Sequence, residues 1–133
     1  MTDTETPPTI EPALRTLAMP GDANPNGDIF GGWVLSQMDL AGSVPASERA
    51  RGRIATVAMD AVRFHRPVYV GDLVSCYARI VKVGNTSITV KVETWATRRH
   101  DVTNVKVTEG TLVYVAIDDV GRPRSVPSDE ARA

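Results

Sequence analysis

The sequence predicts an α+β fold in which a long antiparallel sheet is wrapped around one central helix. Three observations support this prediction: one apolar segment with helical character, four long β-like runs after it, and short polar loops between those runs. Long consecutive strands joined by short loops favour antiparallel pairing, because parallel strands require long crossover connections. We therefore expect an antiparallel meander with the helix on one of its faces.

The length and composition of the chain fit one domain with flexible ends. With 133 residues, of which 42% are apolar, the chain can bury one sizeable core and not two. Residues 1–12 and 122–133 are dominated by polar residues and proline. We expect both segments to be flexible tails that flank a folded domain at 13–121.

The first elements are a short strand and the central helix. The strand is expected at 14–19, where Pro20-Gly21 stops it, and the helix is expected from roughly Gly32 to Ser47. Pro45 falls inside this span, so the helix should end near Val44 or bend there. Apolar side chains cover most of its circumference, which predicts a helix buried on most sides. The remaining narrow strip is small or polar and consists of Gly32, Ser36, Asp39 and Ser43.

Everything after the helix has the pattern of β-strands. Glycine, proline, asparagine and aspartate separate the runs, and one run alternates cleanly between apolar and polar residues from Ile88 to Glu93. Runs of ten or more residues are longer than most strands. The four expected strands are Ile54 to Phe64, Leu73 to Val83, Ser87 to Arg98 and about Asn104 to Ile117.

Charge and cysteine usage exclude several classes of protein. The net charge of −1 argues against general attraction to nucleic acid or to a membrane surface. The single cysteine, Cys76, cannot form an internal disulfide or a cysteine-based zinc site. The first residues lack the cationic and apolar regions of a signal peptide, and no stretch is long and apolar enough to span a membrane. We expect a cytoplasmic protein.

A loop dense in asparagine, proline and glycine runs directly into the helix. It reads Asn24-Pro25-Asn26-Gly27-Asp28-Ile29-Phe30-Gly31-Gly32-Trp33. Gly31 and Gly32 leave backbone N–H groups uncovered at the helix N-terminus, where the helix dipole favours negative charge. Such donors can stabilise the oxyanion that forms when a carbonyl carbon is attacked.

Asp39 is a carboxylate on this otherwise apolar helix. It lies seven residues after Gly32, about two turns at 3.6 residues per turn, so both fall on one helix face. A charge without partners is costly to bury, and a carboxylate in this setting is more often functional than structural. The pattern predicts a site for carbonyl chemistry. Asp39 either activates a water as general base or attacks the carbonyl itself, and the sequence leaves both open.

The order of strand, helix and four long strands is that of the hotdog fold, and the chain resembles the YciA-type acyl-CoA thioesterases. The resemblance covers roughly residues 14–127 and is most specific from Asn24 to Asp39. It includes Leu14-Arg15-Thr16-Leu17-Ala18-Met19-Pro20, Ser36-Gln37-Met38-Asp39, Arg66-Pro67, Val70-Gly71-Asp72, Cys76-Tyr77, Val83-Gly84, Thr86-Ser87, Val92-Glu93-Thr94-Trp95 and Asp118 to Pro123.

This resemblance implies a substrate and an assembly. Enzymes of this family hydrolyse acyl-CoA thioesters, commonly with broad tolerance of the acyl chain. They need no metal, and they usually assemble as hexamers of hotdog dimers. We therefore expect an acyl-CoA thioester hydrolase without a cofactor, since coenzyme A belongs to the substrate and the product. Its site is expected between two protomers of a homo-oligomer.

The resemblance also implies a division of roles. It places the catalytic acid at Asp39 and a site asparagine at Asn24, which could donate to the carbonyl or orient the water. Without the resemblance, Asn24 in this sequence context indicates an ordinary turn. The N–H group of Gly32 is expected to polarise the thioester carbonyl, with Gly31 beside it in contact with the substrate.

Residues for the coenzyme A part of the substrate are expected in two places. The family's contacts fall near a turn whose N–H and hydroxyl groups could meet pantetheine or phosphate: Gly84, Asn85, Thr86 and Ser87. A hairpin turn explains the same residues structurally. The phosphates need basic partners, and the candidates are Arg66, Arg98 and Arg99, although a run of charge is more often simply solvated.

Two other functions remain as alternatives. A hotdog hydratase or dehydratase would act on the same substrate class, and His65 superficially resembles the active-site histidine of such dehydratases. However, His65 follows the helix instead of preceding it, at a position where this thioesterase family usually has an apolar residue. The second alternative is a module that binds acyl-CoA without turning it over.

Overall fold

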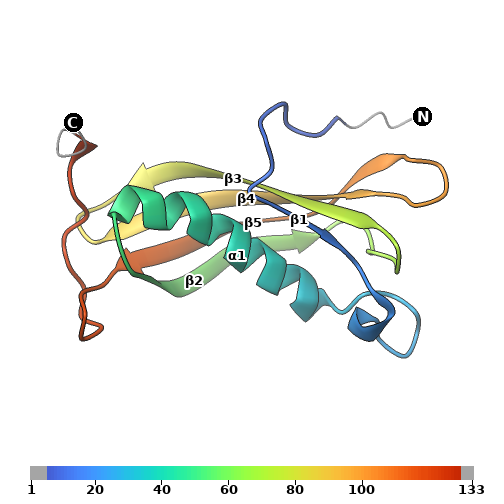
Figure 1. Cartoon of the computed structure of the whole chain (residues 1–133), viewed down its shortest axis with the longest axis horizontal. Helices are drawn as coiled ribbons and strands as arrows, with labels where there is room; N and C mark the ends of the chain where they lie inside the picture. Colours follow the sequence, from blue (N-terminus) through green and yellow to red (C-terminus); the bar gives the residue numbers. More distant parts are fainter. Residues whose placement is uncertain (1–5, 130–133) are drawn as a thin grey trace.

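One helix lies across one face of a five-stranded antiparallel sheet in the computed structural model, which describes residues 6–129 (Figure 1). The elements are β1 (Leu14–Leu17), the 3-10 helix η1 (Pro20–Asp22), α1 (Gly31–Ala50), β2 (Ile54–Phe64), β3 (Leu73–Val83), β4 (Ser87–Thr97) and β5 (Asn104–Ala116). The predicted hotdog architecture is confirmed, and the long strands agree with the sequence pattern to within a residue or so. Within the described residues, no helix is long and apolar enough to cross a bilayer.

The order of the strands differs from a simple meander. Only β3, β4 and β5 follow one another in the sheet, whose order is β1-β3-β4-β5-β2, and every neighbouring pair is antiparallel. The expected pairing of β2 with β3 is therefore wrong. The connection 65–72 between them is long enough to cross the end of the sheet, and β1 occupies the edge beside β3. This order leaves β2 at the opposite edge.

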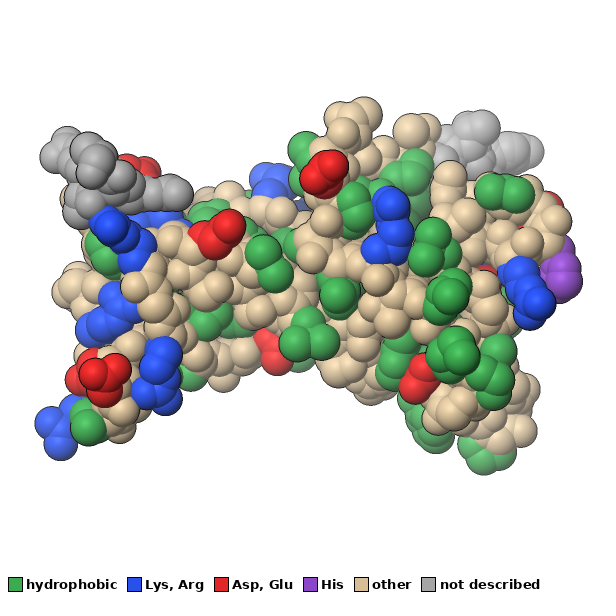
Figure 2. Space-filling model, viewed as in Figure 1, with side chains coloured by type: hydrophobic (Ala, Val, Ile, Leu, Met, Phe, Trp, Pro, Cys, Tyr) green, Lys and Arg blue, Asp and Glu red, His purple; other side chains and the backbone are tan. Residues whose placement is uncertain are grey.

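Helix α1 is longer than expected and less covered. It continues through Pro45 to Ala50, and Arg51 ends it in the left-handed conformation with φ of 56°. Of the two expectations at Pro45, an end near Val44 or a bend, the end near Val44 is wrong, because the helix continues to Ala50. The sheet covers one face of α1, so Leu40 and Val44 on its outer side remain 55% and 44% exposed. The helix is thus not buried on most sides within one chain, and hydrophobic side chains spread over the face that it forms (Figure 2).

The core lies between α1 and the central strands of the sheet. Met38, Ala41 and Ala46 of α1 are fully buried, and they belong to one cluster with Val90 of β4 and Leu112 of β5. The alternation expected in β4 is confirmed, because Ile88, Val90 and Val92 are buried while Thr89, Lys91 and Glu93 are partly exposed. Burial of this apolar surface is the main source of stability.

The segment 122–129 is attached to the body of the protein by hydrogen bonds. The Val126 N–H donates to the Asn85 carbonyl at 2.8 Å, and the Arg124 guanidinium donates to the carbonyl of Ala50 at 2.8 Å at the end of α1. Arg49 also pairs with Asp129 at 3.2 Å. The structured part therefore extends past residue 121, where the sequence pattern ends it. Residues 1–5 and 130–133 of the expected tails lie outside the described residues.

A stability prediction follows from a bulge in β2. The register with β5 shifts between Asp60 and Arg63, and the bulge residue Ala61 has φ of 52°. A side chain in this left-handed region costs about 1–2 kcal/mol, which glycine avoids, whereas the added freedom of glycine in the unfolded chain costs about 0.5–1 kcal/mol. The strain relief is the larger of the two, so we expect Ala61→Gly to raise the free energy of unfolding by about 0.5–1 kcal/mol in urea denaturation.

The matched control is Ala58→Gly, which lies on the same strand outside the positive-φ region. Here glycine should lower the free energy of unfolding by about 1 kcal/mol, because it adds entropy to the unfolded chain without relieving strain. Equal destabilisation by the two substitutions would contradict the strain at Ala61.

Candidate active site

Asp39 is held by contacts from two different strands. Its Oδ1 accepts a hydrogen bond from the Thr56 hydroxyl of β2 at 2.7 Å. Its backbone carbonyl accepts a hydrogen bond from the Tyr114 hydroxyl of β5 at 2.8 Å. The two strands pair with Thr56 opposite Tyr114, so adjacent residues of the sheet fix both the helix backbone and the carboxylate. The residue is only partly buried, and in the described part of the chain the one side-chain hydrogen bond of its carboxylate is to Oδ1.

Tyr114 serves as a neutral hydrogen-bond donor in this arrangement. Burial raises its pKa far above the usual tyrosine range, and the nearby charge of Asp39 raises it further. The phenol therefore keeps its proton at neutral pH. It fixes α1 to the sheet at the turn that carries Asp39.

The N-terminus of α1 has open backbone donors, as the glycine pair predicts. The first helical hydrogen bonds are donated by Trp33 and Val34 to the Phe30 carbonyl, so the N–H groups of Gly31 and Gly32 precede them. Both glycines are exposed, and within the described residues no atom lies within 4 Å of a Cβ built on Gly32. Neither has positive φ, so the absence of a side chain, not an unusual conformation, distinguishes these positions.

The spacing of Gly32 and Asp39 limits what they can do within one chain. Seven residues at 1.5 Å per residue separate them by about 10.5 Å along the helix axis. An oxyanion donor must lie about 3 Å from the carbonyl oxygen, and a general base must reach the attacking water. The two groups of a single helix therefore cannot act on the same carbonyl.

Asn24 forms a tight turn before the helix. Its Oδ1 accepts hydrogen bonds from the N–H groups of Asn26 at 2.9 Å and Asp28 at 3.2 Å. These donors identify the oxygen of the amide, since only an acceptor fits there. In the part of the chain that the structure describes, the Nδ2 group has no hydrogen-bond partner. The turn thus fixes the side chain and leaves its donor available.

The turn from Gly84 to Ser87 lies at the other end of the molecule. It joins β3 to β4 near the C-terminus of α1, while the Asn24 loop precedes the N-terminus of that helix (Figure 1). Asn85 is occupied there by the C-terminal segment, since its carbonyl accepts from Val126 and its Oδ1 accepts from the Ser125 hydroxyl at 3.3 Å. One chain does not bring this turn together with Asn24 and Gly32.

Arg98 is committed to a contact within the chain. Its guanidinium pairs with Asp72, which is 2% exposed, and lies 4.5 Å from the centre of the Tyr69 ring. It also donates to the Pro67 carbonyl at 3.1 Å. This geometry argues against the expected role of Arg98 as a phosphate ligand. Arg99 is exposed beside it, with its side chain packed over Gly71.

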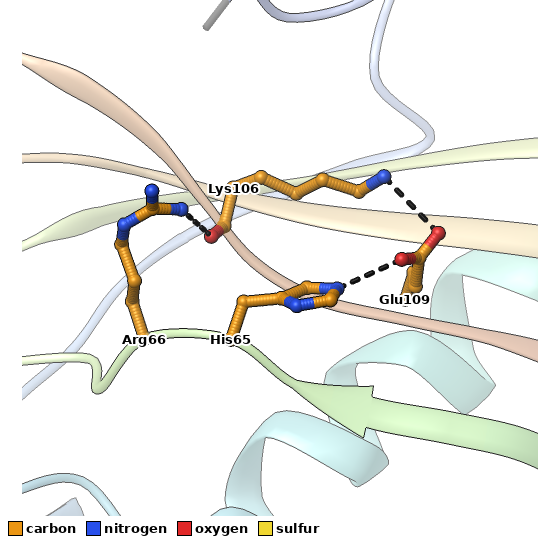
Figure 3. Close-up of a pocket in the computed structure, with 4 residues that line it drawn as sticks. All are labelled: His65, Arg66, Lys106 and Glu109. Atoms are coloured by element: carbon orange, nitrogen blue, oxygen red, sulfur yellow. Dashed lines mark hydrogen bonds and ion pairs between the residues drawn. The ribbon is translucent and has the colours of Figure 1, made fainter. Parts of the chain in front are cut away.

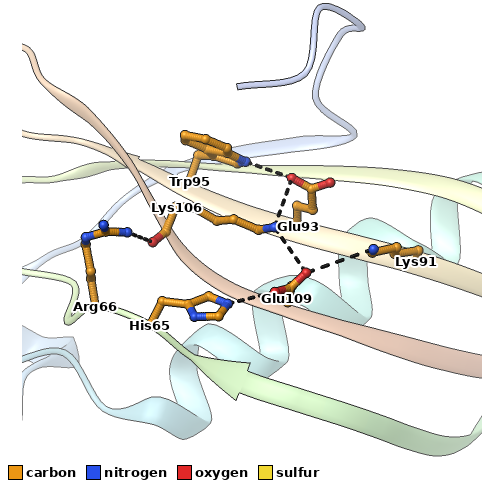
Figure 4. A network of polar contacts seen from close by, with 7 residues as sticks. All are labelled: His65, Arg66, Lys91, Glu93, Trp95, Lys106 and Glu109. Atoms are coloured by element: carbon orange, nitrogen blue, oxygen red, sulfur yellow. Dashed lines mark hydrogen bonds and ion pairs between the residues drawn. The ribbon is translucent and has the colours of Figure 1, made fainter. Parts of the chain in front are cut away.

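Arg66 lies in a cluster on the sheet face opposite α1, here called the outer-face cluster (Figures 3 and 4). The cluster also contains His65, Lys91, Glu93, Trp95, Lys106 and Glu109, and part of it lines a cavity of about 410 Å³. Arg66 donates to the Lys106 carbonyl at 3.0 Å. His65 contacts Glu109 at 2.8 Å, so it faces away from Asp39 of the same chain, and one chain does not bring the two together as a catalytic pair.

Glu109 is the centre of the outer-face cluster. Its hydrogen bonds with His65 and then with Lys106 hold its pKa below the usual glutamate range. A depressed pKa in the folded state stabilises the protein at neutral pH, and this contribution is lost as the pH falls through the acid range. We expect Glu109→Gln to lower the free energy of unfolding at pH 7 and to have little effect near pH 3, measured by urea denaturation.

The control for this prediction is Glu48→Gln, which removes an exposed glutamate of α1. The wild type and the control should lose stability together on acidification, whereas Glu109→Gln should show a flatter profile. A slope in Glu109→Gln as steep as that of the wild type would contradict the depressed pKa.

Cys76 is excluded as a nucleophile. It is 1% exposed, contacts the Thr94 hydroxyl at 3.4 Å, and burial raises its pKa to about 11. The thiol is therefore protonated at neutral pH.

Among the described residues, no three histidine, cysteine, aspartate or glutamate side chains gather as a metal centre would require.

Comparison with known proteins shows the family to which this chain belongs. The sequence profile of the thioesterase superfamily matches residues 26–103, from the asparagine-rich loop to the end of the β4–β5 connection. The chain belongs to the thioesterase superfamily.

Relatives within the superfamily cover nearly the whole chain. The acyl-CoA thioester hydrolase YciA of Salmonella typhimurium is 49% identical over 130 residues, which are 96% of this chain and 98% of the relative. A hexameric thioesterase of Yersinia pestis is 51% identical with a TM-score of 0.86, covering 91% and 98% of the two chains. A hexameric hotdog thioesterase of Campylobacter jejuni is 44% identical with a TM-score of 0.86, covering 92% and 94%.

The sequence pattern does not single out Thr56, whose hydroxyl donates a hydrogen bond to the Asp39 carboxylate in this thioesterase. Threonine is common in strands, so its occurrence in β2 carries no signal of function. Recognising it would have required the position of β2 beside β5, which follows from long-range pairing. Tyr114 was missed for the same reason, since an aromatic residue in a buried strand is also ordinary.

Proposed function

We propose that this member of the thioesterase superfamily hydrolyses acyl-CoA thioesters to a free acid and coenzyme A. The observation that carries the proposal is the Asp39 carboxylate, partly exposed on an apolar helix and oriented by the Thr56 hydroxyl at 2.7 Å. The full-length similarity to acyl-CoA thioester hydrolases supports the substrate class.

In this mechanism Asp39 removes a proton from water as the water attacks the thioester carbonyl. The helix N-terminus at Gly32 stabilises the oxyanion, and the free donor of Asn24 orients the carbonyl or the water. The carbon–sulfur bond then breaks, and the coenzyme A thiolate leaves. Direct attack by the carboxylate would give a mixed anhydride, which water would hydrolyse in a second step. The reaction needs no cofactor besides the coenzyme A of the substrate.

We further propose that each site combines two protomers. Because Gly32 and Asp39 of one helix are about 10.5 Å apart, the acid of one protomer must meet the helix N-terminus of another. The edge strand β2, which carries Thr56, has no neighbour on its outer side among the described residues. The exposed Leu40 and Val44 on α1 also favour association, as do the hexameric assemblies of relatives. We propose a hexamer built from hotdog dimers.

The coenzyme A moiety requires groups that one chain holds far apart. In an assembled dimer, the Gly84–Ser87 turn of one protomer can approach the helix N-terminus of another. In that position the turn can make its proposed contact with the pantetheine arm. Arg99 is an exposed candidate for the phosphates, with Arg66 as the second candidate.

The proposed location of the protein is the cytoplasm. This location suits a chain whose single cysteine is a buried free thiol.

The test is a screen for release of the coenzyme A thiol from acyl-CoA esters of graded chain length. The proposal predicts turnover of at least several of these esters. Formation of enoyl-CoA or hydroxyacyl-CoA without thiol release would favour a hydratase or dehydratase. Tight binding of the esters with no turnover would favour a binding module.

Thr56 should act as a positioning residue for the acid. Loss of its hydrogen bond to the carboxylate in Thr56→Val should lower kcat about tenfold with KM nearly unchanged. Thr56→Ser keeps the hydroxyl and should retain most of the activity. A Thr56→Val enzyme with wild-type kcat, or a Thr56→Ser enzyme as impaired as Thr56→Val, would contradict this role.

A further inference from the structure

Phe64 is a large apolar side chain that remains open to solvent beside the helix N-terminus. It ends β2, and its side chain is 53% exposed. A Cβ built on Gly31 would lie 3.4 Å from its Cζ and 3.5 Å from its Cε1, so the ring rests against the first turn of α1. Gly31 and Gly32 supply the backbone donors of the proposed oxyanion site, and the phenyl ring borders that site.

The alternation of β2 explains why an aromatic ring faces this side. Phe64 is paired opposite Thr108, whose side chain is fully buried, whereas the preceding Arg63 is paired opposite Glu109 of the outer-face cluster. The following residue, His65, also points to Glu109 (Figure 3). The charged neighbours thus occupy the face opposite α1, and Phe64 alone of these three lies on the side of the helix.

Covering the exposed part of the phenyl ring with an apolar group of the substrate would be favourable, because it removes apolar surface from water. The pantetheine arm carries amide groups that need hydrogen-bond partners, and the ring offers none. An alkyl chain needs only apolar surface. Phe30, which precedes Gly31 and is 51% exposed, adds a second apolar side chain next to the same helix end. The acyl chain of the substrate therefore fits this surface better than the pantetheine arm does.

We propose that the Phe64 ring contacts the acyl chain of the substrate and sets how strongly hydrolysis depends on chain length. This inference rests on the proposed thioester hydrolysis. With the carbonyl at the N–H groups of the first helical turn, the methylene groups next to it come within reach of the ring. Each methylene buried against the ring strengthens binding of the transition state, so longer chains gain more than acetyl.

The experiment measures kcat/KM for acetyl-, butyryl-, hexanoyl- and octanoyl-CoA with the wild type, Phe64→Leu and Phe64→Ala. We expect Phe64→Ala to lose about tenfold on octanoyl-CoA and less than about twofold on acetyl-CoA. Phe64→Leu should fall between the wild type and Phe64→Ala. The matched control is Val81→Ala on β3, which trims another exposed apolar side chain and should leave the profile unchanged.

The possible outcomes separate this inference from the proposed function. A wild type that hydrolyses none of the four esters refutes the proposed function itself. An active wild type whose chain-length profile survives in Phe64→Ala refutes the inference alone. A uniform loss on all four esters, with a change in thermal stability or oligomeric state, would also overturn it, because Phe64 would then act through the fold.

Discussion

Replacement of Asp39 by asparagine is expected to lower kcat for acyl-CoA hydrolysis roughly a thousandfold. Asparagine keeps the size of the side chain and can still accept a hydrogen bond from Thr56, so the surrounding structure should be preserved. What it loses is the ability to take a proton from water, or to attack the carbonyl as an anion. The measurement is steady-state thiol release, with binding of the substrate followed separately.

The matched control is Asp60→Asn, which neutralises an exposed carboxylate of β2 outside the proposed site. It should retain nearly full activity. An Asp39→Asn enzyme with more than about a tenth of the wild-type kcat would exclude Asp39 from the chemical step. A large loss in both variants would point to a general effect of charge.

Replacement of Gly42 by alanine is expected to lower the free energy of unfolding by about 2 kcal/mol. A Cβ at this position would lie 2.4 Å from the Tyr114 hydroxyl oxygen and 3.1 Å from its Cζ. Tyr114 is fully buried and bonded to the Asp39 carbonyl, so it cannot move away freely. The clash outweighs the gain of about 1 kcal/mol that alanine otherwise brings to a helix. Chemical denaturation measures the difference.

A second glycine of the same helix tests whether the clash with Tyr114 causes the loss of stability. At Gly32 no described atom lies within 4 Å of an added Cβ, so Gly32→Ala should be neutral or stabilising. Removing the hydroxyl in Gly42→Ala/Tyr114→Phe should recover part of the lost stability, because the closest clash disappears. If Gly42→Ala is as stable as the wild type, helix and sheet are not packed as closely as described.

Local patterns predicted the elements of this fold well. The limits of the long strands follow from runs of β-branched residues that glycine and proline interrupt, and these signals depend on near neighbours in the sequence. The position of β2 beside β5 depends on contacts between distant residues, so the expected meander was wrong. The continuation of α1 through Pro45 was also missed, because Ala46 and Ala50 gain burial against the rest of the fold.

The candidate site was predictable in part. Asp39 and the glycine pair stand out because a carboxylate on an apolar helix and a helix N-terminus without side chains are chemically unusual. Thr56 does not stand out, and neither does the pairing of Arg98 with Asp72, because both depend on which segments meet in space. The seven-residue spacing of Gly32 and Asp39 already implies about 10.5 Å between them along the helix axis, but only the assembled protein can show which groups of two protomers meet.

The most direct test of the central claim mixes two inactive variants. Asp39→Asn removes the acid, and Gly32→Pro removes one N–H donor at a position in the first helical turn where proline is tolerated. When the two variants are co-expressed, hybrid dimers contain one site with both defects and one intact site. Random association should therefore restore about a quarter of the wild-type activity. Activity no higher than that of either variant alone would contradict a site shared between protomers.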